Sequence, residues 1–321
     1  MEGYENIFFE INDEIKKAKS IILTAHINPD GDAVGSGLAL LLTLIDGYPD
    51  KNIRFILQDD IPYTTKFLKF SEKIEQYRGE EVFKVDLLIY LDSATKERTG
   101  KIFERVNAKR TICIDHHISN PEYADINCVI RNSSSTSEIV YNFMKFHNYN
   151  FTKEIAEALY LGLVNDTGNF SHSNVNRGVF LMAADLVALG VDNNYIVNNF
   201  LNSNSYQALK IMGEALKNFK FFKEKKLSYI YIDNLTMEKY AAKKEDTEGL
   251  VEKILSYNEA EVSLFLREEN DGKIKGSMRS KYDVDVNKVA NVFGGGGHYK
   301  AAGFSSSLSA KDILKIVLEK L

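Results

Sequence analysis

The chain has 321 residues and a formal net charge of −5, from 45 acidic and 40 basic side chains. This acidic balance argues against the broad basic surface with which proteins hold long nucleic acids. Its two cysteines, Cys113 and Cys128, lack CxxC spacing, which argues against a disulfide framework or a zinc ribbon. Residues 1–20 do not resemble a signal peptide, and no apolar run approaches the roughly 18 residues of a membrane span. We therefore expect a cytoplasmic protein that does not bind membranes.

Through about residue 190, short apolar runs alternate with longer helical stretches. The runs that indicate buried strands are SIILTAH (20–26), NIRFIL (52–57), DLLIYLD (86–92) and TICID (111–115). Residues 34–46 and 154–164 have the apolar pattern of helices. This alternation predicts an α/β domain over residues 1–194, with a parallel sheet that carries helices on both faces.

Beyond about residue 195 the character of the sequence changes. An Asn-rich and then helical stretch, 195–224, is the expected connector between two domains. The basic and aromatic run 217–226 fits a solvated helix end better than a nucleic-acid stripe. Strand patterns, a four-glycine loop and a final helix then predict a smaller α+β domain over residues 225–321, with a cleft between the two domains.

Metal-ready side chains follow the ends of three predicted strands and one helix. In chain order they are His26, Asp30 and Asp32, then Asp92, then Asp115, His116 and His117, and finally Asp166. Each pattern alone also fits a structural role, such as an Asp that caps a helix. The carboxyl ends of strands in an open α/β sheet are, however, where ligands bind. Together the patterns predict two divalent ions held by His26, Asp30, Asp32, Asp92, His116 and Asp166.

The mixture of imidazole and carboxylate ligands favours Mn²⁺, with Mg²⁺ as the alternative. Ser134, Ser135 and Thr136 precede a helical pattern and fit a helix N-cap. His147 and His172 have no metal-ligand spacing and are expected to be structural or exposed.

Taken in order, HINPDGDAVGS, LDSA, DHH and NDTGNF resemble the four motifs of the DHH phosphoesterase superfamily. GGGGHYKAAGF, preceded by GSMRS, resembles the DHH-associated C-terminal domain. In length and domain order the chain is most similar to the subfamily of two-domain nanoRNases and 3′,5′-bisphosphate nucleotide phosphatases.

The resemblance implies a role for each site residue. One ion would bind His26, Asp30 and Asp92, and the other would bind Asp32, Asp92, His116 and Asp166, with Asp92 as the bridge. The catalytic pair would be His117, which faces the substrate phosphate or leaving oxygen, and Asp115 behind it.

In the second domain, glycines 294–297 would let backbone N–H groups approach an anion, although a flexible hairpin is the alternative explanation. The expected substrate-binding residues are Arg279, Gly294, Gly295, Gly296, Gly297 and His298.

The resulting hypothesis is a metal-dependent phosphodiesterase and phosphatase. Water activated by two metal ions would hydrolyse short oligoribonucleotides such as pGpG, and 3′-phosphoadenosine 5′-phosphate. A cyclic or linear dinucleotide phosphodiesterase and an inorganic pyrophosphatase are the enzymatic alternatives, and a nucleotide- or RNA-binding regulator is the non-enzymatic one. The expected partner is short RNA or a nucleotide, not a long nucleic acid, and a homodimer is compatible with the sequence.

Overall fold

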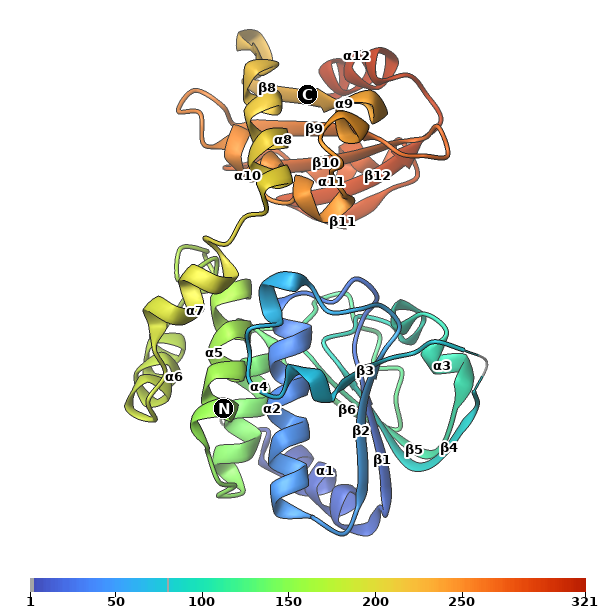
Figure 1. Cartoon of the computed structure of the whole chain (residues 1–321), viewed down its shortest axis with the longest axis vertical. Helices are drawn as coiled ribbons and strands as arrows, with labels where there is room; N and C mark the ends of the chain where they lie inside the picture. Colours follow the sequence, from blue (N-terminus) through green and yellow to red (C-terminus); the bar gives the residue numbers. More distant parts are fainter. Residues whose placement is uncertain (1–2, 80) are drawn as a thin grey trace. The chain divides into compact units, whose positions relative to one another are not determined.

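The computed structural model describes residues 3–79 and 81–321, and the chain divides into two compact units between Ser203 and Asn204 (Figure 1). This boundary lies inside the range 195–224 that the sequence indicates as a connector. Most of that range belongs to elements of the two units: α7 (Asn193–Phe200) precedes the boundary, and α8 (Tyr206–Lys217) and β7 (Lys220–Phe222) follow it.

The first unit is built on a six-stranded parallel sheet with the strand order β3-β2-β1-β4-β5-β6. The strands are β1 (Ser20–Thr24), β2 (Asn52–Leu57), β3 (Ile74–Gln76), β4 (Phe83–Leu91), β5 (Val106–Asp115) and β6 (Ile126–Val129). The central strands are continuous apolar runs because both faces of the sheet are covered.

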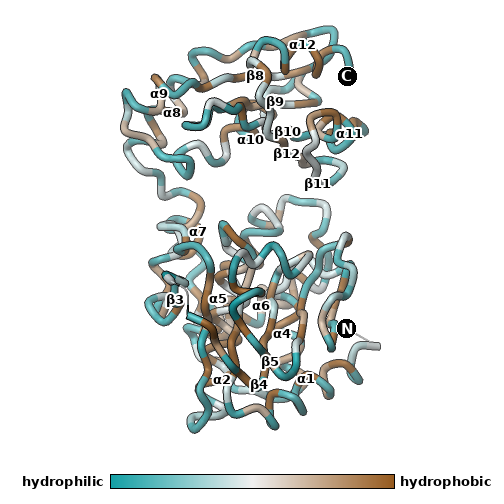
Figure 2. The backbone as a smooth tube through the Cα atoms, turned by 90° about the vertical axis from the view of Figure 1, so that its right-hand side faces the viewer, coloured by the Kyte–Doolittle hydropathy of each residue, from teal (hydrophilic) through white to brown (hydrophobic). Residues whose placement is uncertain are grey.

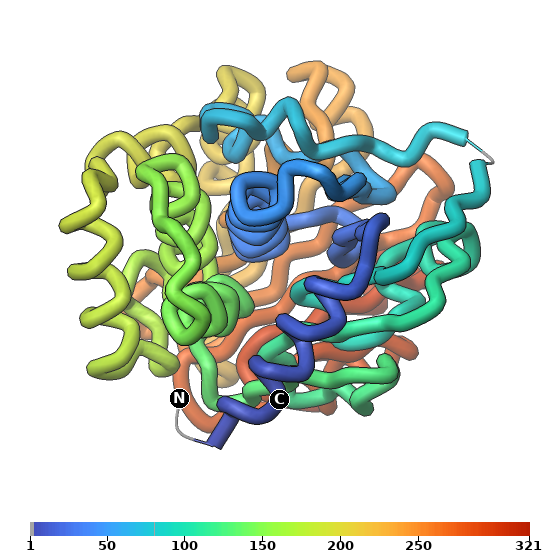
Figure 3. Tube along the Cα trace, turned by 90° about the horizontal axis from the view of Figure 1, so that it is seen from below, coloured from blue at the N-terminus to red at the C-terminus, as the bar shows by residue number. Residues whose placement is uncertain are grey.

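Helices of the first unit lie mainly on one face of this sheet. They are α1 (Glu5–Lys17), α2 (Gly31–Gly47), α3 (Ile102–Arg105), α4 (Thr136–Phe146), α5 (Lys153–Asp166), α6 (Arg177–Ala188) and α7. Helices α2, α4 and α5 pack together over a core that receives Ile21 and Leu23 of β1, and Figure 2 shows α2 and α5 in largely hydrophobic colours. Helix α1 lies beside α4 and strand β6 (Figure 3). On the other face Ile22 packs with Ile102 of the short helix α3 and with aromatic side chains.

The strand order reverses between β1 and β4, which is the feature of this sheet that positions the site. From β1 the chain continues outward to β2 and β3, whereas from β4 it continues outward to β5 and β6. At such a reversal, the loops that leave the carboxyl ends of the two strands diverge, and ligands bind in the space between them.

The second unit contains a mixed six-stranded sheet with the order β11-β12-β10-β9-β8-β7, in which only β8 and β9 pair in parallel. Its further strands are β8 (Leu227–Ile232), β9 (Val262–Glu268), β10 (Ile274–Ser280), β11 (Gly296–His298) and β12 (Ala301–Ser306). Its further helices are α9 (Asn234–Lys239), α10 (Leu250–Leu255), α11 (Val286–Asn291) and α12 (Ala310–Lys320). Helices α11 and α12 cover one face of the sheet, and α8 and α10 cover the other.

The basic run 217–226 is not a helix end, contrary to the expectation from sequence. Helix α8 stops at Lys217, and the run then forms the edge strand β7 and a short 3₁₀ turn, Lys223–Lys225. Phenylalanines at 221 and 222 favour an extended chain because their side chains can pack on opposite faces of the sheet, and the ring of Phe222 contacts Tyr229.

In the described part of the chain no single helix is long and apolar enough to cross a membrane. Helices α6 and α7 reach that length and composition only when taken together, and they are bent by 109° at the break between them.

Candidate metal centre

The first group of candidate ligands lies in the turn between β1 and α2. Asp30 caps α2, because its side chain accepts hydrogen bonds from the backbone N–H groups of Asp32 at 2.9 Å and Ala33 at 3.1 Å. Its carboxylate also lies 3.8 Å from Nε2 of His26. Asp30 therefore does cap the helix, and these hydrogen bonds hold its carboxylate beside the imidazole of His26.

Asp92 lies at the centre of the cluster, immediately after strand β4. Its backbone has a φ of 49°, a left-handed conformation that few residues other than glycine, Asn and Asp adopt readily. The side chain is 3% exposed, and its two oxygens point to different imidazoles. Oδ2 lies 3.5 Å from Nε2 of His26, and Oδ1 lies 3.5 Å from Nε2 of His116. A carboxylate in this position can bridge two ions.

Asp32, His116 and Asp166 form the second group. Nε2 of His116 is 3.1 Å from Oδ2 of Asp166, and Asp32 is fully buried. In each of three sets the ligand atoms lie within 4.8 Å of one another: His26, Asp30 and Asp92; Asp32, His116 and Asp166; Asp92, His116 and His117. The structure thus brings together the side chains of all six candidate ligands, although the chain separates them by up to 140 positions.

His117 is held by a chain of hydrogen bonds that starts at Asp115. Nδ1 of His117 lies 2.7 Å from Oδ1 of Asp115, whose Oδ2 accepts a hydrogen bond of 2.6 Å from Asn120. Asp115 is fully buried, and these two contacts engage both of its oxygens. Nδ1 of His117 also lies 3.7 Å from Asp92, which places this imidazole at the edge of the group.

The buried carboxylates and imidazoles of the cluster interact strongly with one another. Burial alone would lower the pKa of His26, but the neighbouring carboxylates of Asp30 and Asp92 outweigh it and raise the pKa to about 11. In the same way, Asp166 and Asp92 overcome burial and raise the pKa of His116 to about 12. Burial, reinforced by Asp166 and Asp92, holds the pKa of Asp32 well above its usual range. This excess of negative charge and its mixed nitrogen and oxygen donors fit divalent ions such as Mn²⁺.

Metal-free protein is expected to lose stability as the pH rises above about 6.5. The pKa values of His26 and His116 are raised from 6.5 in the unfolded chain to about 11 and about 12 in the folded one. Their stabilisation is therefore complete below pH 6.5 and is lost as the pH rises toward the folded values. Thermal unfolding of the metal-free protein at about pH 6 and about pH 9 measures this loss.

The matched control for this pH dependence is Asp92→Asn, in which both imidazoles lose a shared charged partner, so the stability should depend less on pH. A metal-free wild type that becomes more stable over the interval would contradict the electrostatic account. Mn²⁺ should bind more tightly at the higher pH, because it displaces protons from the imidazoles.

The sequence did not reveal that the N-terminus of α4 takes part in the site. Backbone N–H groups of Thr136 and Ser137 donate to the two oxygens of Asp32, at 2.6 Å and 2.9 Å. As expected, Ser135 is the N-cap of this helix. The serine-rich turn gave a signal for the cap, but nothing in the sequence indicated that Asp32 would lie beside it. The side chains of His172 and Asn174 also hydrogen-bond to the backbone carbonyl oxygen of Asp166.

In the second unit, the residues expected to bind substrate lie on β10 and on or just before β11, the two strands that flank β12. Nε of Arg279, on β10, donates a hydrogen bond of 2.8 Å to Glu252 of α10. The glycine run ends in β11, which pairs with β12. A Cβ at Gly295 would lie 2.3 Å from the carbonyl oxygen of Gly303, so a glycine is needed there for the two segments to pack closely. The glycines therefore have a structural reason that is independent of any ligand.

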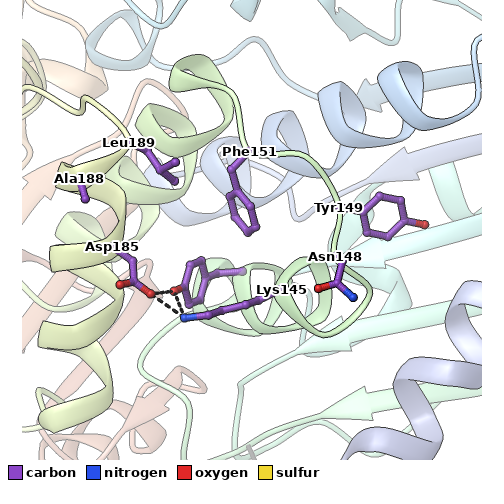
Figure 4. A pocket seen from close by; sticks show the side chains of 8 residues that line it. Lys145, Asn148, Tyr149, Phe151, Asp185, Ala188 and Leu189 are labelled. Carbon is purple, nitrogen blue, oxygen red and sulfur yellow. Dashed lines mark hydrogen bonds and ion pairs between the residues drawn. The ribbon is translucent and has the colours of Figure 1, made fainter.

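A cavity of about 450 Å³ lies away from the carboxylate and imidazole cluster, between α4 and α6 (Figure 4). Phe151, Tyr149 and Leu189 form its apolar wall, while Lys145 and Asp185 form an ion pair of 2.6 Å on the polar side. Because these two charges neutralise each other and Tyr141 also bonds to Asp185, the cavity offers no unsatisfied charge to a ligand.

Comparisons with known proteins agree with this geometry. Residues 20–163 match the family model of the DHH family, N-terminal domain, and residues 225–321 match that of the DHHA1 domain. The chain is 30% identical to the bifunctional oligoribonuclease and PAP phosphatase NrnA of Bacillus subtilis, over 89% of each chain.

Two solved structures show the same fold. An exopolyphosphatase-related protein from Bacteroides fragilis superimposes with a TM-score of 0.93 at 30% identity, covering 98% of this chain and 96% of that one. RecJ from Thermus thermophilus, solved in complex with Mn²⁺, has a TM-score of 0.59 at 11% identity. That comparison covers 100% of this chain and 55% of RecJ, and at this identity it shows the fold alone.

Proposed function

Since this chain belongs to the DHH family of phosphoesterases, we propose that it hydrolyses short oligoribonucleotides and 3′-phosphoadenosine 5′-phosphate. The observation that carries the proposal is the position of Asp92 between His26 and His116, with one carboxylate oxygen directed to each. The name of the B. subtilis relative, an oligoribonuclease and PAP phosphatase, supports the choice of substrates.

In this proposal the cluster holds two divalent ions. His26, Asp30 and Asp92 would hold one, and Asp32, Asp92, His116 and Asp166 the other. When bound, the ions supply a water nucleophile at neutral pH and neutralise charge on the phosphate. Mn²⁺ is favoured by the mixed donor set, and the RecJ structure with Mn²⁺ supports a manganese site on this fold.

His117 is the side chain best placed to handle a proton. Nδ1 lies 2.7 Å from an oxygen of the buried Asp115, which fixes the orientation of the ring at the edge of the cluster, 3.7 Å from Asp92. We assign His117 the donation of a proton to the leaving oxygen, or of a hydrogen bond to the phosphate. Asp115 orients the imidazole.

The second unit would bind the part of the substrate that does not react. Of the donors on Arg279, Nε is held by Glu252 and Nη1 bonds to the carbonyl oxygen of Met278. These two contacts fix the guanidinium plane while Nη2 remains on a side chain that is one-third exposed. We propose that this guanidinium, which lies in the same sheet as His298 and Gly297, contacts a phosphate of the substrate. The N–H groups of Gly294 and Gly295 already donate to carbonyl oxygens at the end of α11, so these two glycines serve the packing of the loop.

Wild-type protein with Mn²⁺ is expected to hydrolyse dinucleotides such as pGpG faster than longer RNA, and to release phosphate from 3′-phosphoadenosine 5′-phosphate. The physical reason is that a chain with a net charge of −5 has little overall electrostatic attraction for a long phosphate backbone. Product chromatography on RNAs of two to about twenty nucleotides, with chelator as the control, measures the preference.

Equal rates on the shortest and longest RNAs would contradict the short-substrate proposal. Cyclic dinucleotides and pyrophosphate belong in the same panel. A clear preference for either one would identify a different phosphoesterase and leave the metal centre in place.

A further inference from the structure

The serine-rich turn, residues 133–137, leads into helix α4 and touches two of the candidate metal ligands. The first N–H groups of any helix have no partner within that helix. Here the N–H groups of Thr136 and Ser137 donate to Oδ2 and Oδ1 of Asp32, which is 104 and 105 positions away. Both oxygens of a fully buried carboxylate are thus held from one side, so its rotation is restricted.

The hydroxyl of Thr136 makes the second contact. It donates a hydrogen bond of 3.2 Å to Oδ1 of Asp92, the oxygen that faces His116. Thr136 is fully buried, and it contacts two carboxylates that the proposed centre assigns to the same ion, Asp32 through its N–H and Asp92 through its hydroxyl. Because this hydrogen bond occupies one lone pair of Oδ1, an ion could bind this oxygen only through its other lone pair and so from a restricted direction.

Contacts around the turn keep it in this position. Oε2 of the buried Glu138 accepts hydrogen bonds from the hydroxyls of Ser133 and Ser134 and from the N–H of Ser134. The amide of Asn174 donates to the carbonyl oxygens of both Ser134 and Asp166, at 3.0 Å and 3.1 Å. The turn is therefore tied to the backbone of a third candidate ligand.

The turn packs closely against α5, and this packing requires a glycine at position 162. A Cβ on Gly162 would lie 2.0 Å from the hydroxyl oxygen of Ser137 and 2.5 Å from Oδ1 of Asp32. Because glycine has no side chain, position 162 leaves the space in which the turn and Asp32 meet.

We propose that Thr136 is a positioning residue that sets the orientation of Asp92 and Asp32 and thereby the affinity of the centre for the ion beside His116. The inference rests on the proposed two-ion centre and adds a residue that determines its affinity. Groups that hydrogen-bond to metal ligands typically change metal affinity by about 10- to 100-fold when they are removed.

The test is Mn²⁺ titration of the full-length protein by calorimetry. In Thr136→Val the hydroxyl is lost while the N–H to Asp32 and the branched shape remain, so we expect roughly 10- to 100-fold weaker binding of one ion. Thr136→Ser restores the hydroxyl and should bind close to wild type. Thr136→Ala removes the hydroxyl without placing a methyl group against Asp92, and it should reproduce the defect if the valine variant folds poorly.

The matched control is Thr43→Val in α2. Thr43 is also a buried threonine, but its hydroxyl donates to the carbonyl oxygen of Ala39 and not to a candidate ligand. This variant should bind Mn²⁺ like wild type, and its thermal unfolding without metal measures the cost of the substitution alone.

The possible outcomes separate the inference from the proposed centre. Wild-type affinity in both Thr136→Val and Thr136→Ala would overturn the inference alone. Equal weakening in the serine variant would also overturn it, because that variant keeps the hydroxyl. A wild-type protein that binds no Mn²⁺ would overturn the proposed centre and the inference with it.

Discussion

Replacing Asp92 by Asn is expected to remove nearly all turnover, on the order of 10³-fold or more, which corresponds to about 4 kcal/mol. The substitution keeps the shape of the side chain but removes the charge that lies between His26 and His116. Since both proposed ions share this carboxylate, the loss affects both of them. Turnover of pGpG with Mn²⁺ and the number of bound ions per chain measure the effect.

Asp50→Asn is the control for Asp92→Asn, because the same chemical change is made at an exposed position outside the cluster. It should leave rate and metal content at wild-type values. An Asp92→Asn protein that keeps two bound ions and more than about a tenth of the wild-type rate, a loss of only ~1.4 kcal/mol, would rule out the bridging role.

Replacing His117 by Ala should lower kcat by about 10²- to 10⁴-fold, the range found for general acid or base groups. Metal content should stay near wild type, because Nδ1 of this imidazole is bound to Asp115. The loss should be smaller for a substrate with a nitrophenolate leaving group, which departs without a proton. Steady-state kinetics on the two kinds of substrate, with metal analysis of the same samples, measures both effects.

A loss of one ion in His117→Ala would instead make this residue a ligand, as its nearness to Asp92 and His116 allows. The companion variant Asp115→Asn separates orientation from chemistry. It keeps the proposed proton donor and removes only the charge that orients the ring, so its loss of kcat should be smaller than that of His117→Ala.

The sequence predicted the parts of the fold whose signals are local. Strands such as β4 and β5 lie in a sheet that is covered on both faces, so they appear as uninterrupted apolar runs that are easily recognised. Strands β3 and β6 were not predicted, because three or four residues are too few to establish a pattern. The polar residues after β1, β4 and β5 were predicted to meet because parallel strands end at one edge of the sheet.

What the sequence could not show are contacts between distant segments. Thr136 looks like part of an ordinary helix cap, and only the fold places Asp32 against it. The ion pair between Arg279 and Glu252, 27 positions apart, likewise has no local signal. In both cases the residue type was noticed, but its partner depended on how whole elements pack.

The most direct test of the two-ion centre is a crystal structure of the protein soaked in Mn²⁺, with the ions located by their anomalous scattering. We predict two ions, the first bound by His26, Asp30 and Asp92 and the second by Asp32, Asp92, His116 and Asp166. A single ion, or two ions that do not share Asp92, would contradict the account.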